Sequence, residues 1–381
     1  MGRSYLDYNA TAPLRPEVSR AMAGAAWGNP SSLHAEGRAA RACLEGARET
    51  LARALGARPA ELVFTGSATE ANNLALRGLF GGPAGERPRL ALSQVEHPSV
   101  VQTARALVAS GQAEGADAIA VDGEGRLRPE ALRRAVGRQT RVVSVLAASN
   151  ETGVLQDIGA VVEAARAAGA LVHVDAVQRF GRLPLDVASL GADLVTVSSH
   201  KLGGPRGAGA LWVRPGVALR PQIAGGHQER NRRGGTEDVP AIVGFAEAAR
   251  VATADLETEA RRLAALRDRL WEGIAEAVPG VRVLGLAAPR LPNTLSLVFP
   301  GADGEALLFG LDLAGVAASS GSACTAGSLE PSPALLAMGL DEGTARSALR
   351  VSLGWASTAA DVEHLTRVLP DIVARARQEA A

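Results

Sequence analysis

The chain has 381 residues, of which 47% are hydrophobic but only 3% aromatic, so leucine, valine and alanine must fill its core. This length exceeds that of a usual single domain and predicts one large and one smaller domain. Forty basic and forty acidic residues cancel, and no basic block occurs, which gives binding to nucleic acid or to a membrane surface no electrostatic support. Only two cysteines are present, and neither a secretory leader nor an apolar run of membrane-spanning length is found, so we expect a cytoplasmic protein.

Apolar, β-rich runs alternate with helical patterns through the first two thirds of the chain. After a helical pattern at 34–55, strands are expected to begin near residues 62, 89, 117, 142, 171 and 193. This alternation predicts an α/β fold with a mostly parallel sheet that helices cover on both faces. Residues 208–213 are expected to add an antiparallel edge strand.

The pattern changes after a long helical tract over residues 238–277. Strands expected near 281–284, 293–299 and 348–353 are grouped with helices at 304–313 and 360–377. Such grouping predicts a separate α+β domain.

Charged side chains follow two of the expected strands. Asp175 ends the run at 171–174, and Lys201 follows the run at 193–197 within the sequence SSHKLGG. An open α/β sheet binds its ligands at the carboxyl ends of its strands. A lysine there can form a Schiff base, and an aspartate can hold a proton on a pyridine nitrogen, as pyridoxal phosphate chemistry requires. A structural ion pair is the alternative interpretation.

Several other motifs each allow two interpretations. Residues 66–70, GSATE, have the capping-box spacing at Ser67 and Glu70, and form either a well-capped helix start or a phosphate cradle that includes Thr69. His97 is either a surface residue at a helix start or a ring stacked on a planar cofactor. Asn150 is either a turn residue or a substrate contact. The glycine/arginine-rich loop over 225–236 is either a solvated connector or an anion-binding arm.

The two cysteines have different neighbours. Cys43 lies within a helical pattern and is expected to be a small apolar residue. Cys324 lies in SGSACTAGS, a composition typical of an exposed loop, which favours a nucleophilic thiol over a buried structural one. No second cysteine or histidine lies at ligand spacing, so no metal site is expected.

Ten motifs extend this pattern over nearly the whole chain: YLDYNATAP, GNPSSLH, TGSATEANN, VEHPSV, ASNETGVLQDI, HVDAVQ, SSHKLGGPRG, GGHQERNRRGGTEDV, SGSACTAGSLEPS and LRVSLG. Together they resemble the pyridoxal-phosphate-dependent cysteine desulfurases of the class-V aminotransferase family, and SGSACT is similar to the housekeeping and nitrogen-fixation branch. The resemblance implies fold type I. Its large cofactor-binding domain, over 12–257, would hold a mostly parallel seven-stranded sheet. Residues 1–11 and 258–381 would form the smaller α+β domain with the cysteine loop.

The resemblance also implies a role for each site residue. Lys201 would hold pyridoxal 5'-phosphate covalently, Asp175 would pair with its ring nitrogen, and Gln178 would reach its phenolic oxygen. His97 would stack on the ring and act as an acid/base. The remaining cofactor contacts, mostly to the phosphate, would come from Ala68, Thr69, Asn150, Ser198, His200 and, toward the neighbouring subunit of a homodimer, Thr236. Asn150 and Arg350 would bind the carboxylate of the substrate.

The implied activity is conversion of L-cysteine to L-alanine, with the sulfur passing to Cys324 as a persulfide for iron–sulfur cluster or other thio-cofactor assembly. A scaffold protein would accept the sulfur, and the persulfide could transiently ligate a cluster. A selenocysteine lyase or related lyase or aminotransferase of the same fold is the alternative, and it would not need Cys324. Lys201, Asp175 and His97 argue against a protein that kept the fold without the chemistry. A dinucleotide-binding protein is excluded, because no glycine fingerprint follows the first strand.

Overall fold

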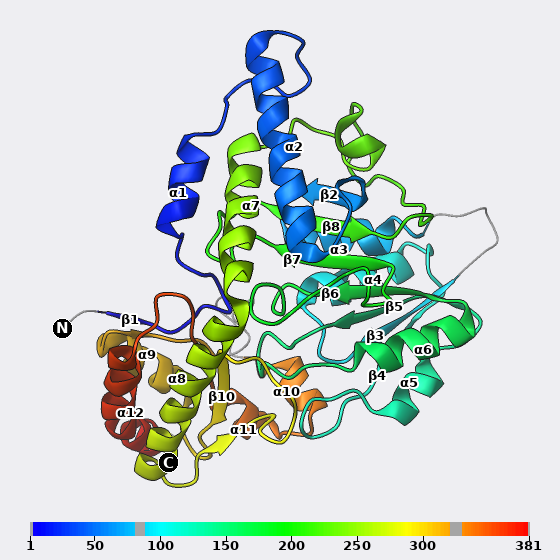
Figure 1. The fold of residues 1–381 in the computed structure, drawn as a ribbon. Helices are drawn as coiled ribbons and strands as arrows, with labels where there is room; N and C mark the ends of the chain where they lie inside the picture. The colour runs from blue at the N-terminus through cyan, green and yellow to red at the C-terminus, as the bar shows by residue number, and fades with distance from the viewer. Residues whose placement is uncertain (1–2, 81–87, 321–329, 380–381) are drawn as a thin grey trace.

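The computed structural model describes residues 3–80, 88–320 and 330–379. Its largest sheet holds seven strands, seen in the right half of Figure 1. In spatial order they are β2 (Leu62–Thr65), β8 (Gly209–Val213), β7 (Leu194–Ser198), β6 (Leu171–Asp175), β5 (Thr140–Leu146), β3 (Arg89–Ser93) and β4 (Ala116–Ile119). Only the pairings made by β8 are antiparallel within this described sheet. The prediction of a mostly parallel sheet is therefore confirmed.

The position predicted for the antiparallel strand was wrong. β8 was expected at an edge, but it pairs with β7 on one side and with β2 on the other. All five residues of β8 are buried, as is typical of an inner strand. The edge strand on this side of the sheet is β2. The carboxylate of Glu229 covers part of that edge by accepting a hydrogen bond from Phe64 N at 2.8 Å.

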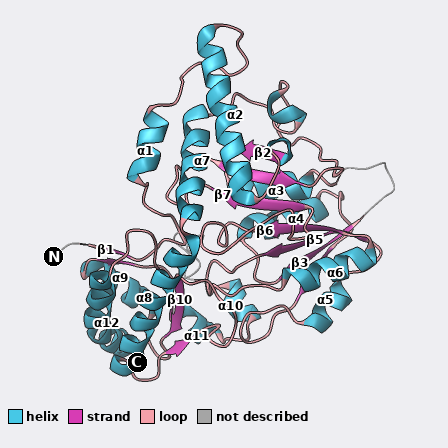
Figure 2. Ribbon diagram, in the orientation of Figure 1, coloured by secondary structure: helices cyan, strands magenta, loops and turns pink. Residues whose placement is uncertain are grey.

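Helices cover both faces of the large sheet, which makes three layers (Figure 2). One face packs against α1 (Pro16–Ala23), α2 (Ala35–Leu55), α5 (Pro129–Ala135), α6 (Ile158–Ala168) and α7 (Val239–Ala254). The other packs against α3 (Ala68–Arg77) and α4 (Pro98–Ala109). The strands are apolar on both sides because both sides face a helical layer. The short 3-10 helices η1 (Pro59–Glu61) and η2 (Gln228–Asn231) lie in connecting loops.

A second apolar core surrounds a small antiparallel sheet. This sheet has the order β12 (Ala348–Ser352), β10 (Thr294–Val298) and β9 (Arg282–Val283). It packs with α8 (Leu256–Ala277), α9 (Gly304–Leu313) and α12 (Ala359–Glu379). The helical tract expected over 238–277 is divided at Asp255, whose backbone is not helical. A domain boundary at residues 257 and 258 stays a prediction.

Two further segments connect the two cores. The first residues of the chain form β1 (Ser4–Tyr5), which pairs with β11 (Val316–Ala317), and then run toward the large sheet. The short helices α10 (Pro333–Ala337) and α11 (Glu342–Arg346) contribute to a cluster that contains apolar side chains from both sheets. No helix in the described ranges is both long and apolar enough to cross a membrane.

Candidate active site

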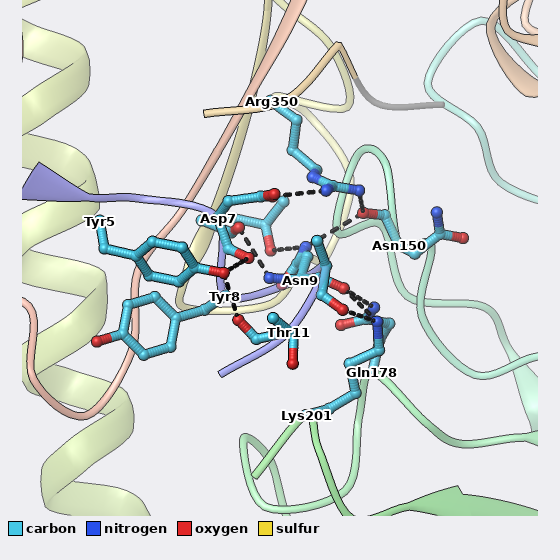
Figure 3. A network of polar contacts seen from close by, with 12 residues as sticks. Tyr5, Asp7, Tyr8, Asn9, Thr11, Asn150, Gln178, Lys201 and Arg350 are labelled. Carbon is cyan, nitrogen blue, oxygen red and sulfur yellow. Dashed lines mark hydrogen bonds and ion pairs between the residues drawn. The ribbon is translucent and has the colours of Figure 1, made fainter. Parts of the chain in front are cut away.

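The candidate site lies where β5, β6 and β7 end and where the first residues of the chain cross the large sheet. Lys201 follows β7, and its Nζ donates to Asn9 O at 2.6 Å and to Ala10 O at 2.7 Å. The segment that crosses the sheet, residues 7–12, is called the crossing segment. It is also fixed by a hydrogen bond from Ala12 N to His200 O, at 2.9 Å. Figure 3 shows that Lys201 and Gln178 both approach the backbone of this segment.

Asp175 is the last residue of β6 and is buried. Its Oδ2 accepts from Asn72 Nδ2 at 2.8 Å, and its Oδ1 accepts from Val177 N at 3.0 Å. Asn72 Nδ2 also donates to Ser99 Oγ at 2.9 Å. The carboxylate is therefore oriented by neutral donors, which leaves its charge uncompensated by these contacts.

His97 precedes α4 and caps its start. Its Nδ1 accepts from Ser99 N at 3.1 Å and lies 2.7 Å from Ser99 Oγ. This geometry assigns the proton of the neutral ring to Nε2. Burial lowers the pKa of His97, the positive charge of Lys201 lowers it further, and Asp175 acts in the opposite direction. The ring is therefore neutral at neutral pH.

Beside Lys201, a cavity of about 300 Å³ opens at the start of α3. Its polar lining comes from four hydrogen-bonding side chains and one guanidinium, and the whole lining is Ala10, Thr11, Ser67, Ser198, His200, Arg206, Gly207 and Ala208. Ala68 and Thr69 form the first turn of α3, whose backbone N–H groups favour an anion. A helix N-terminus, hydroxyl groups and an arginine fit the chemistry of a phosphate group.

The start of α3 differs from the expected capping box in one contact. Ser67 Oγ accepts from Glu70 N at 3.1 Å, as predicted. Glu70 Oε2, however, accepts from Gly66 N at 2.7 Å rather than from the N–H of Ser67. Glu70 Oε1 accepts from Arg233 Nε at 2.9 Å, so the glycine/arginine-rich loop is attached to this turn.

His200 is a lining residue whose charge state bears on phosphate binding. Its Nδ1 lies 3.2 Å from Thr11 Oγ1. Burial, and then the positive charges of Lys201 and Arg182, lower the pKa of His200 to about 4. His200 is thus a neutral hydrogen-bonding group, and Arg206 is the cation that lines this cavity.

Arg350 lies on β12 and is buried. Its Nη1 donates to Asn150 O at 3.0 Å, and its Nη2 lies 2.7 Å from Asp7 Oδ1. The side chain of Asn150 is turned away from the guanidinium in Figure 3, so the main chain of Asn150 makes the contact with Arg350. The structure therefore brings Arg350 and Asn150 together through the backbone oxygen of Asn150.

Gln178 takes its orientation from residues that the sequence did not single out. Its Nε2 donates to Asn9 O at 3.0 Å, and its Oε1 accepts from Arg182 Nη1. Arg182 also donates to Tyr8 O at 3.3 Å. The motif YLDYNATA marked this segment without giving it a role. Its contacts are mostly made by backbone carbonyls, which leave no side-chain signal in a sequence.

Two predicted site residues are not placed with this group. Thr236 is exposed and is not among the described residues that line the cavity. Cys324 lies outside the described residues. Cys43 is half-buried on α2, as expected. Within the described ranges, no three His, Cys, Asp or Glu side chains gather in a way that would hold a metal ion.

Comparison with known proteins places this architecture in one family. The family description "Aminotransferase class-V" matches residues 4–365. An IscS-like cysteine desulfurase from Mycobacterium tuberculosis is 43% identical over 387 residues, which cover 99% of this chain and 98% of the relative.

Two solved structures share the fold. A NifS-like protein superimposes with a TM-score of 0.91 at 34% identity, over 98% of this chain and 100% of the other. A structure described as SspA in complex with cysteine gives a TM-score of 0.81 at 33% identity, over 92% and 98% of the two chains.

The chain therefore belongs to the class-V aminotransferase family of pyridoxal-phosphate-dependent enzymes. Within that family it is a member of the cysteine desulfurases, which confirms the prediction from its sequence motifs.

Proposed function

We propose that this enzyme uses pyridoxal 5'-phosphate to convert L-cysteine to L-alanine and transfers the sulfur to Cys324. The observation that carries the proposal is the arrangement of Lys201, Asp175 and His97 around the ends of neighbouring strands, next to a cavity that fits a phosphate. The chemistry of these donors matches the parts of the cofactor that need holding.

Each part of the cofactor has a group to receive it. Lys201 would hold its carbonyl carbon, and Asp175 would hold a proton on its ring nitrogen. Gln178 would reach the phenolic oxygen, and His97 would lie against the ring. The phosphate would be bound by Ala68 N, Thr69, Ser198, His200 and Arg206. When bound, the cofactor would withdraw electrons from the substrate and so weaken its Cα–H and Cβ–S bonds.

The side chains of this chain would perform the remaining steps. Arg350 would bind the substrate carboxylate, beside Asn150, and the Lys201 amine would move the proton at Cα. The thiolate of Cys324 would then form an S–S bond to the substrate sulfur. The electron pair of the Cβ–S bond would stay on Cβ, which takes up a proton to become the methyl group of alanine. Cys324 would be left as a persulfide.

We also propose that two copies of the chain share their sites. Thr236 is exposed and lies outside the cavity of its own chain, so it is available to the phosphate of a second copy. The sulfur acceptor would be a scaffold protein for iron–sulfur clusters, as the names of the relatives suggest. Two results would contradict the sharing of sites: a monomeric wild-type enzyme in sedimentation experiments, or an unchanged cofactor affinity in Thr236→Ala.

The test is alanine and persulfide formation from L-cysteine, measured with reductant in wild type and in Cys324→Ala. We expect the variant to keep the visible absorbance band of the bound cofactor but to lose alanine formation. Lys201→Ala should lose the band itself. Cys43→Ser, which changes a thiol away from the site, is the matched control and should behave as wild type. Full activity in Cys324→Ala would instead indicate a lyase of the same fold.

A further inference from the structure

Two described residues on either side of Cys324 in the sequence, Ser319 and Ser332, contact the same part of the site. On its N-terminal side, Ser319 forms a two-way backbone bridge with Arg350 on β12: Arg350 N donates to Ser319 O at 2.6 Å, and Ser319 N donates to Arg350 O at 3.2 Å. The backbone at Ser319 is therefore paired with Arg350, the residue whose side chain we assign to the substrate carboxylate.

On the C-terminal side of Cys324, Ser332 is buried. The hydroxyl of Ser332 donates to Glu151 Oε2 at 2.6 Å. The same Oγ accepts from Leu335 N at 3.3 Å and so caps α10. Ser332 thus has two separable contacts, one to its own helix and one across to the large-sheet side of the site.

Glu151 belongs to the turn that contacts Arg350. Ser149 Oγ accepts from Glu151 N at 3.2 Å and from Thr152 N at 3.1 Å, which fixes the turn. The residue directly before Glu151 is Asn150, whose main-chain oxygen accepts a hydrogen bond from Arg350 Nη1 at 3.0 Å. Burial raises the pKa of Glu151, while the Ser332 hydroxyl and the Arg350 charge favour its ionised form.

We propose that Glu151 and Ser332 are positioning residues, which fix the residues that follow Cys324 in the sequence, from Ser332 onward, relative to Arg350. A hydrogen bond from a buried hydroxyl to a carboxylate is short and directional, and such support keeps a reacting group in register with its substrate. The inference rests on the proposed function, because it takes Cys324 as the nucleophile and Arg350 as the substrate contact.

The position of α10 does not depend on this hydrogen bond. Ala334 and Leu335 pack in a buried cluster with Val95 and Leu146 from the large-sheet side and with Val298 from β10. Removing the Ser332 hydroxyl should therefore leave the helix packed. The expected change is in the position of the backbone at Ser332 relative to Glu151.

The test compares variants that separate the hydrogen bond to Glu151 from the cap. Ser332→Ala removes both, whereas Ser332→Asp keeps a capping side chain but sets a like charge against Glu151. Ser332→Thr restores the hydroxyl, and Glu151→Gln keeps an acceptor. Asp303→Ala is the matched control, because Asp303 caps a different helix, α9, by accepting from Ala306 N at 2.8 Å.

Two quantities are measured in the holoenzyme: the Kd for L-cysteine, from the change in cofactor absorbance, and the rate of the first alanine formed. We expect Ser332→Ala and Ser332→Asp to slow the first turnover about tenfold, the equivalent of one lost hydrogen bond, with the Kd for cysteine nearly unchanged. Ser332→Thr, Glu151→Gln and Asp303→Ala should stay close to wild type. A wild-type rate in Ser332→Asp would overturn the proposal, because the cap alone would then explain Ser332.

A second measurement does not require activity. In apoenzyme that carries Cys43→Ser, the remaining thiol is alkylated with iodoacetamide, and we expect the rate to rise severalfold in Ser332→Ala but not in Asp303→Ala. An unchanged rate would also overturn the proposal. If the unmodified enzyme forms no alanine, or forms it without Cys324, the proposed function fails instead, and the two failures are distinguishable.

Discussion

Arg350 Nη2 lies 2.7 Å from Asp7 Oδ1, so the guanidinium that we assign to the substrate already pairs with a carboxylate of its own chain. Arg350 is 2% exposed, and an arginine this deeply buried requires a partner. The contact shows that Asp7 orients the guanidinium before any substrate arrives (Figure 3). An incoming carboxylate would share Arg350 with Asp7 rather than meet an uncompensated charge.

Replacing Arg350 with lysine should weaken cysteine binding by about tenfold or more, because lysine keeps the charge but loses the planar fork. The Kd is measured by titration with L-cysteine in a Cys324→Ala background, which prevents turnover. Arg346→Lys is the control, since its side chain is 53% exposed in a surface pair with Glu342. An unchanged Kd in Arg350→Lys would remove Arg350 from the substrate site.

Gly209→Ala should weaken cofactor binding. A Cβ at Gly209 would lie 2.5 Å from Ser67 C and 2.7 Å from Ala68 N, and these backbone atoms could move only by shifting the start of α3. Affinity is measured by titrating apoenzyme with pyridoxal phosphate. Gly46→Ala on α2 meets no atom within 4 Å and should bind the cofactor normally, with a gain in stability of about 0.5–1 kcal/mol. Equal affinities in the two variants would argue against the phosphate cradle.

Glu229→Gln should lower the free energy of unfolding by about 3 kcal/mol, because it removes the buried counter-charge of Arg48 and leaves only the partly exposed Glu45 beside it. Glu229 Oε1 lies 2.6 Å from Arg48 Nη2, and the side chains of the two residues are 0% and 3% exposed. Urea unfolding measures the change. Glu342→Gln, in an exposed pair with Arg346, should cost no more than about 0.5 kcal/mol. Similar losses in both variants would show that burial does not determine how much the Arg48–Glu229 pair contributes to the free energy of unfolding.

Glu96→Gln should alter how stability depends on pH. Burial, with a smaller contribution from Asp175, raises the pKa of Glu96 to about 8. The folded protein thus holds this proton more tightly than the unfolded chain, in which the pKa of the carboxyl has its ordinary value of 4.5. The resulting stability is present below about pH 4.5 and is lost as the pH rises through about 8.

The glutamine variant lacks that loss. Its stability relative to wild type should therefore increase between about pH 4.5 and pH 8, by several kcal/mol in all, and then level off. Urea unfolding at a series of pH values measures the difference. The exposed Glu114→Gln should give a flat difference over the same range, and a flat result for Glu96→Gln would show that Glu96 is ionised when folded.

The sequence predicted those parts of the site that local patterns encode. An apolar run followed by Asp175, a second run followed by Lys201, and Ser67 three residues before Glu70 each have a local signature, and the structure has a strand end or a helix cap at each. The placement of β8 between β7 and β2 has no such signature, because strand order depends on pairings between distant residues. The same holds for Glu70, whose carboxylate contacts Gly66 N and the distant Arg233.

The contacts of residues 7–12 were the least predictable. Lys201, Gln178 and Arg182 all donate to backbone oxygens of this segment, and any residue type could supply such an oxygen. The motif at these positions is recognisable. The direction of its carbonyl groups, however, is set by the pairing of β1 with β11 and of Asp7 with β12. Those pairings join residues more than three hundred positions apart in the chain.

This arrangement has a consequence for synthesis on the ribosome. The first dozen residues emerge first, yet they need Lys201, Thr294, Arg350 and Ser352 as partners, and the last of these emerge near the end of translation. The large sheet could form while the chain is still growing. The crossing segment would have to wait beside it without its partners. A nascent chain should therefore acquire the ability to bind cofactor late and in one step, once β12 has left the ribosome.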